Sequence, residues 1–518
     1  MNCNQEVSAN DIIVNGVGSV TEDFTKAYKS INEVLDKLPI ESKTKLLSLL
    51  SQTVETEDAT SESSHDSSDS DYGEEAPLYS YPNVPATPNR RAPKNVMSFR
   101  CSQTGAPLGW RNVFNLPISY DLEVVPGCLN PSGPHSGLAD FMQPHNGPRR
   151  RFLVIDEAVD KLYGAQIRVY FEAHGVQTHV VVLPGEECSK RYQAVDTILE
   201  ECCKFGLHRR EPIVGIGGGV ILDIVGMAAN LYRRGVPYFR VPTTLLALVD
   251  ASVGVKNGVD YCSVSKGPQK NRIGSFYAPS AVYLDKSFVA TQDKRNIVNG
   301  LGEIMKLALV RSTELFNLLE EHGERLVLEK FQGQDKVADR VIELSIEIML
   351  EELGPNLWEY KLERCVDFGH TFSKIIEMQP NADIMHGEAV NIDGFLCVLI
   401  SHRRGLITLE ERNRIFACMT AMGLPTTCDF CTMEVLKQGL IDAVEHRHGA
   451  QRIPLVKGIG GSVVVNDITP AELEVALRDL VEVHSTSPHK ESEKIMADPT
   501  NSVSELSLKE KHKAPADH

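Results

Sequence analysis

Short apolar runs alternate with longer stretches of helical periodicity between about residues 101 and 296. Buried parallel strands are continuously apolar, and each needs a crossover connection, usually a helix, to reach the next strand. The alternation therefore predicts an α/β domain with a Rossmann-like parallel sheet at residues 101–296. The expected strands are residues 152–155, 178–183 and 212–216, and the expected helices between them are residues 161–174 and 192–205.

After about residue 296 the strand-like runs end and helical periodicity dominates. We expect an all-helical second domain at residues 297–484. Active sites of such two-part proteins favour the region where the halves meet. The clearest expected helices are residues 300–319, 337–352, 388–403 and 409–422.

The two ends of the chain differ in composition from this core. Residues 1–100 are expected to form an N-terminal arm that begins with a short helical hairpin, because apolar residues recur at helical spacing from Phe24 to Leu38 and again from Leu46. Residues 53–76 contain nine acidic residues, many serines and no Lys or Arg, which predicts a disordered linker or a phosphorylated regulatory element. The polar, lysine-rich residues 485–518 are expected to form a disordered tail.

Composition narrows the class of protein. Of 518 residues 42% are hydrophobic, and the formal net charge of −17 argues against a nucleic-acid partner. No apolar run is long enough to predict a membrane span, and the first residues lack the features of a secretory signal. Twelve irregularly spaced cysteines suit a reducing compartment, so we expect a cytoplasmic location. Because nine of the negative charges lie in the linker, the net charge says little about an active site.

Three consecutive glycines, Gly217, Gly218 and Gly219, stand where an expected strand turns into a helix. Glycine lets the backbone approach a pyrophosphate closely, and a helix N-terminus offers amide donors to it. The spacing differs from G-x-G-x-x-G, so a dinucleotide site and a tight packing turn both remain open. Asp156, at the end of the first expected strand, is a candidate ligand for ribose hydroxyls or an ordinary helix cap.

Polar residues follow the next expected strand. Thr243 and Thr244 end that strand, Asp250 and Lys256 flank a turn of small residues, and further polar side chains follow at 270–272. Basic residues beside a nucleotide site suggest a phosphorylated small substrate, although a solvated basic face has the same composition.

Three residues of the second domain form a candidate metal site. Glu303, His370 and His386 supply one carboxylate and two imidazoles, a standard catalytic zinc set that leaves positions open for substrate oxygens. Spacing alone does not show that they converge, and histidines beside glycine are commonly structural. Cys428 and Cys431 form a C-x-x-C without a second pair, which we interpret as ordinary thiols.

Taken together, these motifs resemble the sugar phosphate cyclase family, whose best-known member is 3-dehydroquinate synthase. The resemblance covers about residues 101–480 and depends on motifs that occur in the family's order. They are the glycine run with Asp223, Arg-Gly-Val-Pro followed by Val-Pro-Thr-Thr-Leu-Leu, Asp250 with Lys256, Lys270-Asn271, Gly-Glu-Ile-Met-Lys306, Phe-Gly-His370-Thr-Phe and His386-Gly-Glu-Ala-Val.

The resemblance implies a set of ligands and roles. It implies a homodimer, with Arg234 reaching a substrate phosphate, often in the neighbouring subunit. A divalent metal, zinc or alternatively cobalt, would be held by Glu303, His370 and His386. The implied catalytic residues are Lys256, Lys306, Asp250 and Asn271, and the implied substrate-binding residues are Arg234, Lys270, Asp367 and Lys374. NAD would be bound by Asp156, Glu187, Lys190, Gly217, Gly218, Gly219, Asp223, Thr243 and Thr244.

The implied reaction uses NAD as a recycled cofactor. A ring hydroxyl is oxidised transiently, phosphate is eliminated, the hydride is returned, the ring opens, and an intramolecular aldol step closes a carbocycle. Two departures from dehydroquinate synthases favour sedoheptulose 7-phosphate as substrate. Lys374 replaces a histidine, and the acidic Glu363 aligns with an arginine near the substrate carboxylate, although Arg364 is adjacent.

The motif Val255-Lys-Asn-Gly-Val is more similar to 2-epi-5-epi-valiolone synthases than to desmethyl-4-deoxygadusol synthases, which remain the alternative. 3-Dehydroquinate synthase itself, a metal-dependent polyol dehydrogenase of the same fold and a non-catalytic nucleotide-binding scaffold are further alternatives.

Overall fold

The computed structural model describes residues 12–14, 96–101, 107–112, 117–133, 135–140, 148–265 and 267–486. The chain forms two units, and the larger one contains everything described from Ile118 onward. In the smaller unit β1 (Ile12–Val14), β2 (Val96–Cys101) and β3 (Pro107–Asn112) form an antiparallel sheet. The predicted helical hairpin and acidic linker, and the tail beyond residue 486, lie outside the described residues.

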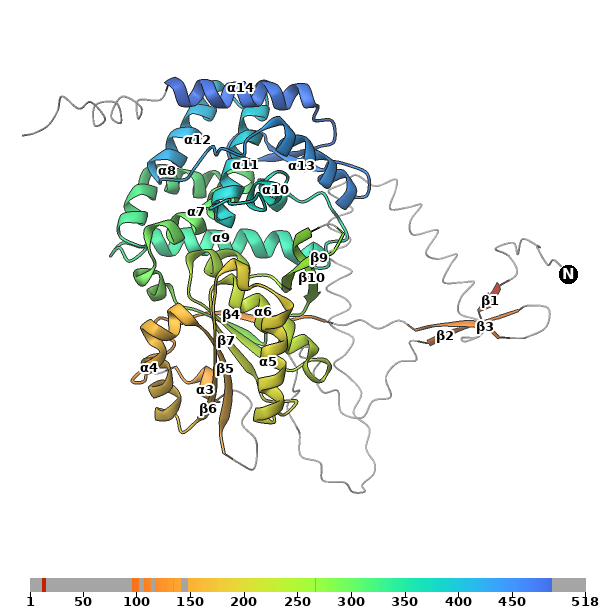
Figure 1. Cartoon of the computed structure of the whole chain (residues 1–518), viewed down its shortest axis with the longest axis vertical. Coiled ribbons are helices and arrows are strands. Elements are labelled where there is room, and N and C mark those ends of the chain that lie inside the picture. The colour runs from red at the N-terminus through yellow and green to blue at the C-terminus, as the bar shows by residue number, and fades with distance from the viewer. Residues whose placement is uncertain are drawn as a thin grey trace, which may run out of the picture. The chain divides into compact units, whose positions relative to one another are not determined.

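The larger unit is built on a six-stranded sheet in which every neighbouring pair is parallel (Figure 1). This confirms the predicted parallel α/β architecture. Phe152, for example, pairs with Ile213 on one side and His179 on the other. The strands in spatial order are β4 (Asp121–Val124), β11 (Ala281–Leu284), β8 (Tyr238–Pro242), β7 (Ile213–Gly217), β5 (Arg150–Asp156) and β6 (Gln177–Leu183).

Both faces of the sheet are buried at its inner strands β7, β8 and β11, which explains why these strands are largely apolar. Phe152 and Val154 pack into a core with α5 (Tyr192–Phe205) and α6 (Gly219–Leu231). Leu153 and Ile155 point the other way, into a core with α4 (Glu157–Ala173). Each such fully buried side chain stabilises the fold by about 1.5–3 kcal/mol. Alternate side chains of one strand thus hold helices on opposite faces.

Between β8 and the helical half the chain forms several elements that do not belong to the main sheet. A π-helical turn, η3 (Ala247–Ala251), leads to a β-hairpin of β9 (Lys256–Ser263) and β10 (Gly267–Phe276). The other short elements of the unit are α3 (Gly137–Asp140), η1 (Glu187–Ser189), η2 (Tyr232–Arg234), η4 (Lys286–Thr291), η5 (Gly354–Asn356) and η6 (Cys365–Asp367).

The second half of the unit is helical around two central helices, α7 and α11 (Figure 1). Residues 297–310 of α7 and 387–401 of α11 are buried without interruption. The helices of this half are α7 (Lys294–Arg311), α8 (Thr313–Leu328), α9 (Val337–Leu353), α10 (Ser373–Glu377), α11 (His386–Arg403), α12 (Leu409–Ala421), α13 (Met433–His446) and α14 (Pro470–Thr486).

Glycine allows α7 to pass very close to the start of α11. A Cβ atom added to Gly302 would lie 2.2 Å from the carbonyl oxygen of Gly387. The amide of Gly387 donates a hydrogen bond to Asn299 Oδ1 at 2.6 Å. This close approach brings the residues next to the glycines, Glu303 and His386, to the same place.

The structure differs from the sequence prediction in two parts of this half. The helix expected at residues 300–319 is two helices, because the Ser312 side chain accepts a hydrogen bond from the amide of Leu315 and begins a new helix. The half also contains a β-hairpin, β12 (Ile453–Val456) with β13 (Ser462–Val465). Its strands are too short to stand out among helical periodicities. No helix in the described ranges combines the length and apolar character needed to cross a membrane.

Candidate active site

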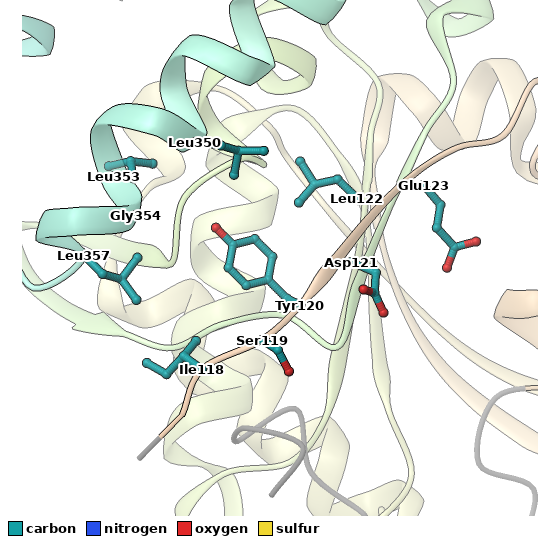
Figure 2. Close-up of a pocket in the computed structure, with 10 residues that line it drawn as sticks. All are labelled: Ile118, Ser119, Tyr120, Asp121, Leu122, Glu123, Leu350, Leu353, Gly354 and Leu357. Carbon is teal, nitrogen blue, oxygen red and sulfur yellow. The ribbon is translucent and has the colours of Figure 1, made fainter. Parts of the chain in front are cut away.

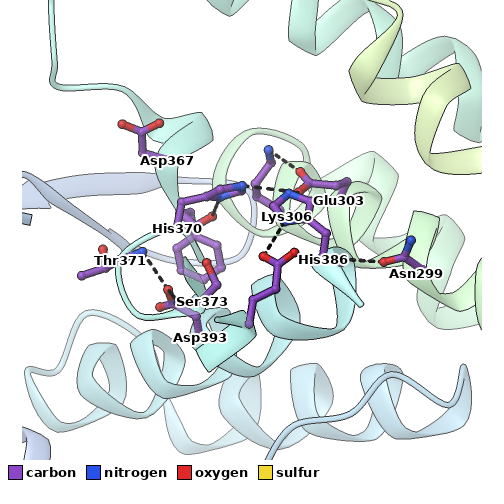
Figure 3. A network of polar contacts seen from close by, with 12 residues as sticks. Asn299, Glu303, Lys306, Asp367, His370, Thr371, Ser373, His386 and Asp393 are labelled. Carbon is purple, nitrogen blue, oxygen red and sulfur yellow. Dashed lines mark hydrogen bonds and ion pairs between the residues drawn. The ribbon is translucent and has the colours of Figure 1, made fainter. Parts of the chain in front are cut away.

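The three predicted metal ligands converge. One ligand atom from each of Glu303, His370 and His386 lies within 4.8 Å of the others (Figure 3). Glu303 Oε1 is 3.5 Å from His370 Nε2 and 3.4 Å from His386 Nε2. Glu303 comes from α7, His370 from the loop before α10, and His386 is the first residue of α11. The helix expected at residues 388–403 therefore begins two residues earlier, at His386.

The chemistry of this cluster fits a divalent cation. Glu303 is 1% exposed, and within the described chain its Oε1 atom accepts no hydrogen bond. His370 Nδ1 lies 3.0 Å from the carbonyl oxygen of Phe368, which can only accept, so the proton is on Nδ1 and Nε2 presents a lone pair. Lone pairs that face one another in a buried place need a cation between them.

Glu377 holds the second histidine and was missed by the sequence analysis. Its Oε2 atom lies 3.3 Å from His386 Nδ1, which leaves Nε2 for the metal. Glu377 also forms an ion pair with Lys270, whose ammonium is 3.2 Å from Glu187. Burial raises the pKa of Glu377, but the hydrogen bond with His386 and the charge of Lys270 outweigh it and lower the pKa to about 2. Glu377 is therefore an anion at any physiological pH.

The loop that carries His370 is fixed by a buried carboxylate. Asp393 Oδ2, on α11, accepts hydrogen bonds from the amides of Thr371, Phe372 and Ser373 at 2.7, 2.5 and 2.9 Å. Figure 3 shows Asp393 beside this loop. Arg447, at the end of α13, donates to the carbonyl oxygen of His370 at 3.4 Å. Neither residue belongs to a motif that the sequence analysis identified.

Lys306 and Asp250 lie within the electrostatic field of the metal cluster. Lys306 is one turn after Glu303 and its ammonium is 2.5 Å from Glu303 Oε2. Burial lowers the pKa of Lys306, but Glu303 and Asp250 reverse this and leave it raised. Burial and the charge of Glu303 raise the pKa of Asp250, on the π-helical turn η3. π-Helical turns recur at functional sites.

Lys256 is near enough to Asp250 for its charge to oppose the rise in the Asp250 pKa, and 58% of the Lys256 side chain is exposed. Its ammonium is 2.9 Å from Glu359, and Glu359 also pairs with Arg364. Arg364 in turn forms two hydrogen bonds to Asp367, at 2.5 and 3.3 Å. Charges therefore alternate from Lys256 through Glu359 and Arg364 to Asp367.

This arrangement corrects one reading of the sequence. Glu363, which aligned with the carboxylate-binding arginine, is exposed, while Arg364 points to Asp367. An arginine is thus present, but two carboxylates already neutralise it. Desolvation and the charge of Arg447 lower the pKa of Lys374, whose charge also interacts with that of Asp367.

The predicted cofactor residues meet at the carboxyl edge of the sheet. Asp156 ends β5 and Gly217 ends β7, two adjacent strands between which the strand order reverses. Nucleotides bind α/β sheets at such a switch point. The amide of Thr243 donates to the Gly217 carbonyl at 3.0 Å, and a Cβ on Gly218 would lie 3.2 Å from Thr244.

The start of α6 is open to an anion. The helix begins at Gly219, and its cap residue, Gly218, has no side chain to occupy the first amides. Asp156 caps α4 instead, because its Oδ1 atom accepts from the amide of Ala158 at 2.7 Å. Asp156 thus has the structural role that the sequence left open, and its Oδ2 atom faces Gly185.

The remaining predicted cofactor residues form a tight ionic group. Lys190 and Asp223 are 2.6 Å apart, and Lys190 is 6% exposed. Burial opposes the charged form of Lys190, yet Asp223 and Glu187 raise its pKa. Glu187 is paired with Lys270, so this group continues into the Lys270–Glu377–His386 contacts.

Two predicted residues lie apart from the cluster. Asn271 has a positive φ of 50° at a bulge in the β9–β10 hairpin, where its amide donates to Asp260 at 2.7 Å. Arg234 is exposed on the turn after α6, with a φ of 67°. The described contacts place neither side chain at the metal ligands.

A pocket of about 700 Å³ lies elsewhere on this unit, between β4 and the end of α9 (Figure 2). Tyr120 stands on one wall, with Leu350, Leu353 and Leu357 on the other. It contains none of the predicted site residues, so we assign it no part in the chemistry.

Comparison with known families matches both halves of the core. The family model for the N-terminal domain of 3-dehydroquinate synthase matches residues 180–299, and the one for its C-terminal domain matches residues 300–446. The two matches meet where the sheet half gives way to the helical half.

Individual relatives show which members of the family the chain is similar to. The chain is 49% identical over 335 residues to a 2-epi-5-epi-valiolone synthase of Actinoplanes, covering 64% of this chain and 83% of that protein. It is 46% identical over 374 residues to another from Streptomyces albus, covering 71% and 90%. It is also similar to the solved 2-epi-5-epi-valiolone synthase of Streptomyces hygroscopicus subsp. jinggangensis, which has NAD+ and Zn2+ bound. That structure has a TM-score of 0.66 and 41% identity, and the match covers 72% of this chain and 99% of the other.

Proposed function

Because this chain belongs to the 3-dehydroquinate synthase family, we propose that it is a 2-epi-5-epi-valiolone synthase that converts sedoheptulose 7-phosphate and releases phosphate. The observation that carries the proposal is the 49% identity to a synthase of that name, over 83% of that protein and 64% of this chain. The convergent ligand set at Glu303, His370 and His386 supports it, because a non-catalytic scaffold does not require a set of convergent metal ligands.

We assign the two cofactors to the two halves of the unit. Glu303, His370 and His386 would hold the divalent metal, zinc or cobalt, and the sheet edge with Gly217–Gly219, Asp223, Thr243 and Thr244 would hold NAD. When bound, these groups supply a reversible hydride acceptor and a Lewis acid for substrate oxygens. Lys270 pairs with both Glu187, beside the proposed NAD site, and Glu377, which contacts His386, and so connects the two sites.

The lysines of the site have different roles in this proposal. Lys306 is buried, cationic and paired with Glu303, so it would stabilise negative charge on a substrate oxygen and donate a proton to it. Lys256 is exposed at its tip, so it would orient the sugar with Asp250 and Asn271. Lys270, Asp367 and Lys374 would complete the substrate contacts. Arg234 would reach the phosphate of a substrate in the neighbouring subunit, which makes the active form a homodimer in the cytoplasm.

The ion pairs around Arg364 support a substrate without a carboxylate. Both Glu359 and Asp367 already neutralise this guanidinium, and Arg–carboxylate pairs of this kind are strong. A carboxylate substrate would have to break one of them and would face the other acidic side chain. A seven-carbon sugar phosphate that lacks a carboxylate meets no such conflict.

The experiment is product analysis with purified protein, NAD+, Zn2+ and sedoheptulose 7-phosphate. The proposal expects phosphate release without accumulation of NADH, and a product with the mass of 2-epi-5-epi-valiolone. The mass of desmethyl-4-deoxygadusol would assign the alternative cyclase. Steady NADH accumulation without phosphate release would indicate a polyol dehydrogenase. Turnover of the seven-carbon acid substrate of 3-dehydroquinate synthase instead would overturn the specificity argued from Arg364.

A further inference from the structure

Two cysteines that the proposed reaction does not use lie side by side at the start of α13. The Cys428 and Cys431 sulfur atoms are 3.6 Å apart. The backbone between them forms a turn, in which the amide of Cys431 donates to the carbonyl oxygen of Cys428 at 3.1 Å. Both side chains are half-buried against the core of the helical half, so the turn that pairs them is held in place. Closing a disulfide from this position requires the sulfurs to move together by about 1.5 Å.

The two thiols are chemically unequal. The hydrogen bond from the Cys431 thiol lowers the pKa of Cys428 to about 7, against the effect of burial, and the amides of Phe430 and Cys431 add to it. The same contact, with burial, raises the pKa of Cys431. Burial raises the pKa of the other described cysteines for which a shift is resolved: Cys128, Cys202, Cys365, Cys397 and Cys418.

We propose that Cys428 and Cys431 are a reversible redox site, with Cys428 as the attacking thiol and Cys431 as the resolving thiol, that closes to a disulfide on reaction with a small-molecule disulfide such as oxidised glutathione. The Cys428 thiolate attacks one glutathione sulfur, and one glutathione thiolate leaves. Cys431 then loses its proton and attacks Cys428, which releases the second glutathione thiolate. The two cysteines lose two electrons and two protons, and the oxidised glutathione gains them.

This proposal replaces the interpretation of the pair as ordinary thiols. Ordinary thiols need neither contact between the sulfurs nor a difference in acidity, and both are present here. A redox motif of this kind has a nucleophilic first cysteine, a second cysteine within reach and a following helix whose N-terminus favours the thiolate. The first two features are present here; α13 begins at Met433, five residues after Cys428, and the amides that favour the Cys428 thiolate are those of Phe430 and Cys431.

The experiment uses the full-length protein, reduced and then equilibrated with glutathione buffers of increasing oxidised fraction at neutral pH. Acid quenching and peptide mass mapping would identify each cysteine's state. We expect the peptide with Cys428 and Cys431 to lose two hydrogens and to regain them with dithiothreitol. The Cys431→Ser variant should instead accumulate a glutathione adduct on Cys428, and the Cys428→Ser variant should react at least about 10-fold more slowly at this segment.

The matched control is Cys262→Ser, which removes an exposed thiol from strand β9 and should leave the reaction at residues 428–431 unchanged. Two results would overturn the proposal. One is a pair that stays reduced in buffers that oxidise a simple dithiol. The other is equal adduct formation on Cys428 and Cys431 in the two serine variants, because this would show that the attacking and resolving roles do not exist.

Discussion

The cofactor edge of the sheet and the metal cluster of the helical half are built in different ways. The edge consists mainly of backbone: glycines at a strand end, the amides of a helix N-terminus and a carbonyl bonded by Thr243. The cluster consists of side chains from three separate segments. Glu377 contacts His386, and Asp393 accepts hydrogen bonds from the loop that carries His370. The edge should therefore be sensitive to added volume, whereas the cluster should be sensitive to the loss of single functional groups.

The largest effect is expected from the cluster itself. His386→Ala removes a ligand, so bound zinc should be lost and turnover should fall by at least on the order of 10³-fold. NAD binding should stay within about 2-fold, because the sheet edge is untouched. Metal analysis, NAD titration and activity would check this. His402→Ala, on the last turn of the same helix, is the control. A variant that retains zinc and near-normal turnover would refute the ligand assignment.

Lys306→Ala tests whether the cluster needs more than its ligands. Turnover should fall on the order of 10²–10³-fold while zinc stays bound, because the lysine supplies charge rather than coordination. Removal of one member of a buried pair also costs stability, about 3–5 kcal/mol. Circular dichroism and thermal melts would show that the folded protein is assayed. Lys294→Ala, at the exposed start of α7, is the matched control. Unchanged turnover would remove Lys306 from the catalytic set.

Gly185→Ala tests the edge by adding volume. The new Cβ atom would lie 1.7 Å from Asp156 Oδ2, so the carboxylate or the loop must move. We expect NAD affinity to fall by about 10-fold or more, since 1.4 kcal/mol already gives that factor, with zinc content unchanged. Gly354→Ala is the control, because no atom of the described residues lies within 4 Å of its added Cβ. Normal NAD affinity in Gly185→Ala would show that Asp156 and the loop that faces it have no part in binding the nucleotide.

Glu377→Gln tests the support behind a ligand. It keeps the shape of the side chain but loses the charge that orients His386 and pairs with Lys270. Zinc affinity should fall by about 10–100-fold, a typical result for partners of metal-binding histidines, and excess zinc should restore turnover. Competition with a chelator would measure it. Glu321→Gln, exposed on α8, is the control. If zinc affinity did not change, Glu377 would have no part in holding the metal.

Deletion of residues 1–117 should have the smallest effect. The described residues of the sheet edge and the metal cluster all lie after Ile118, in the larger unit. The values of kcat and KM should therefore stay within about 2-fold of those of the full chain, and both cofactors should still bind. A large loss of turnover in a folded variant would show that the arm contributes to catalysis.

Local parts of the structure were predictable from the sequence. The helix Tyr192–Phe205 was placed at its observed bounds because its apolar face, its αL glycine at Gly206 and the strand before it all agree. The glycine run was interpretable because strand, turn and helix lie within a few residues. The metal ligands were recognisable as a zinc-type set from their residue types, but only the resemblance to a family implied that they bind one ion, since nothing in their spacing brings residues 303, 370 and 386 together.

Residues that act through long-range contacts were not predictable. Glu377 follows Ile375 and Ile376 at the end of a five-residue helix, and no motif in the sequence distinguishes it, yet the structure places it against His386 and Lys270. Arg364 and Glu363 are neighbours, and only the turn of the chain decides which of them faces Asp367. Burial and partner are properties of the folded chain, so a single sequence does not specify them.

The edge strand β4 has a consequence for how the chain folds. Asp121 pairs with Ala281, and the amide of Gly127 donates to Asp285, 158 residues away. Strands β5 to β8 are closer in sequence and can associate first, because contacts between distant segments carry a greater loop-closure cost. During synthesis β4 leaves the ribosome long before β11. Because β4 pairs with β11, it can join the sheet only after β11 has been made. The edge of β8 that β11 covers therefore has no strand partner until β11 has been synthesised, and unpaired strand edges favour association with other chains.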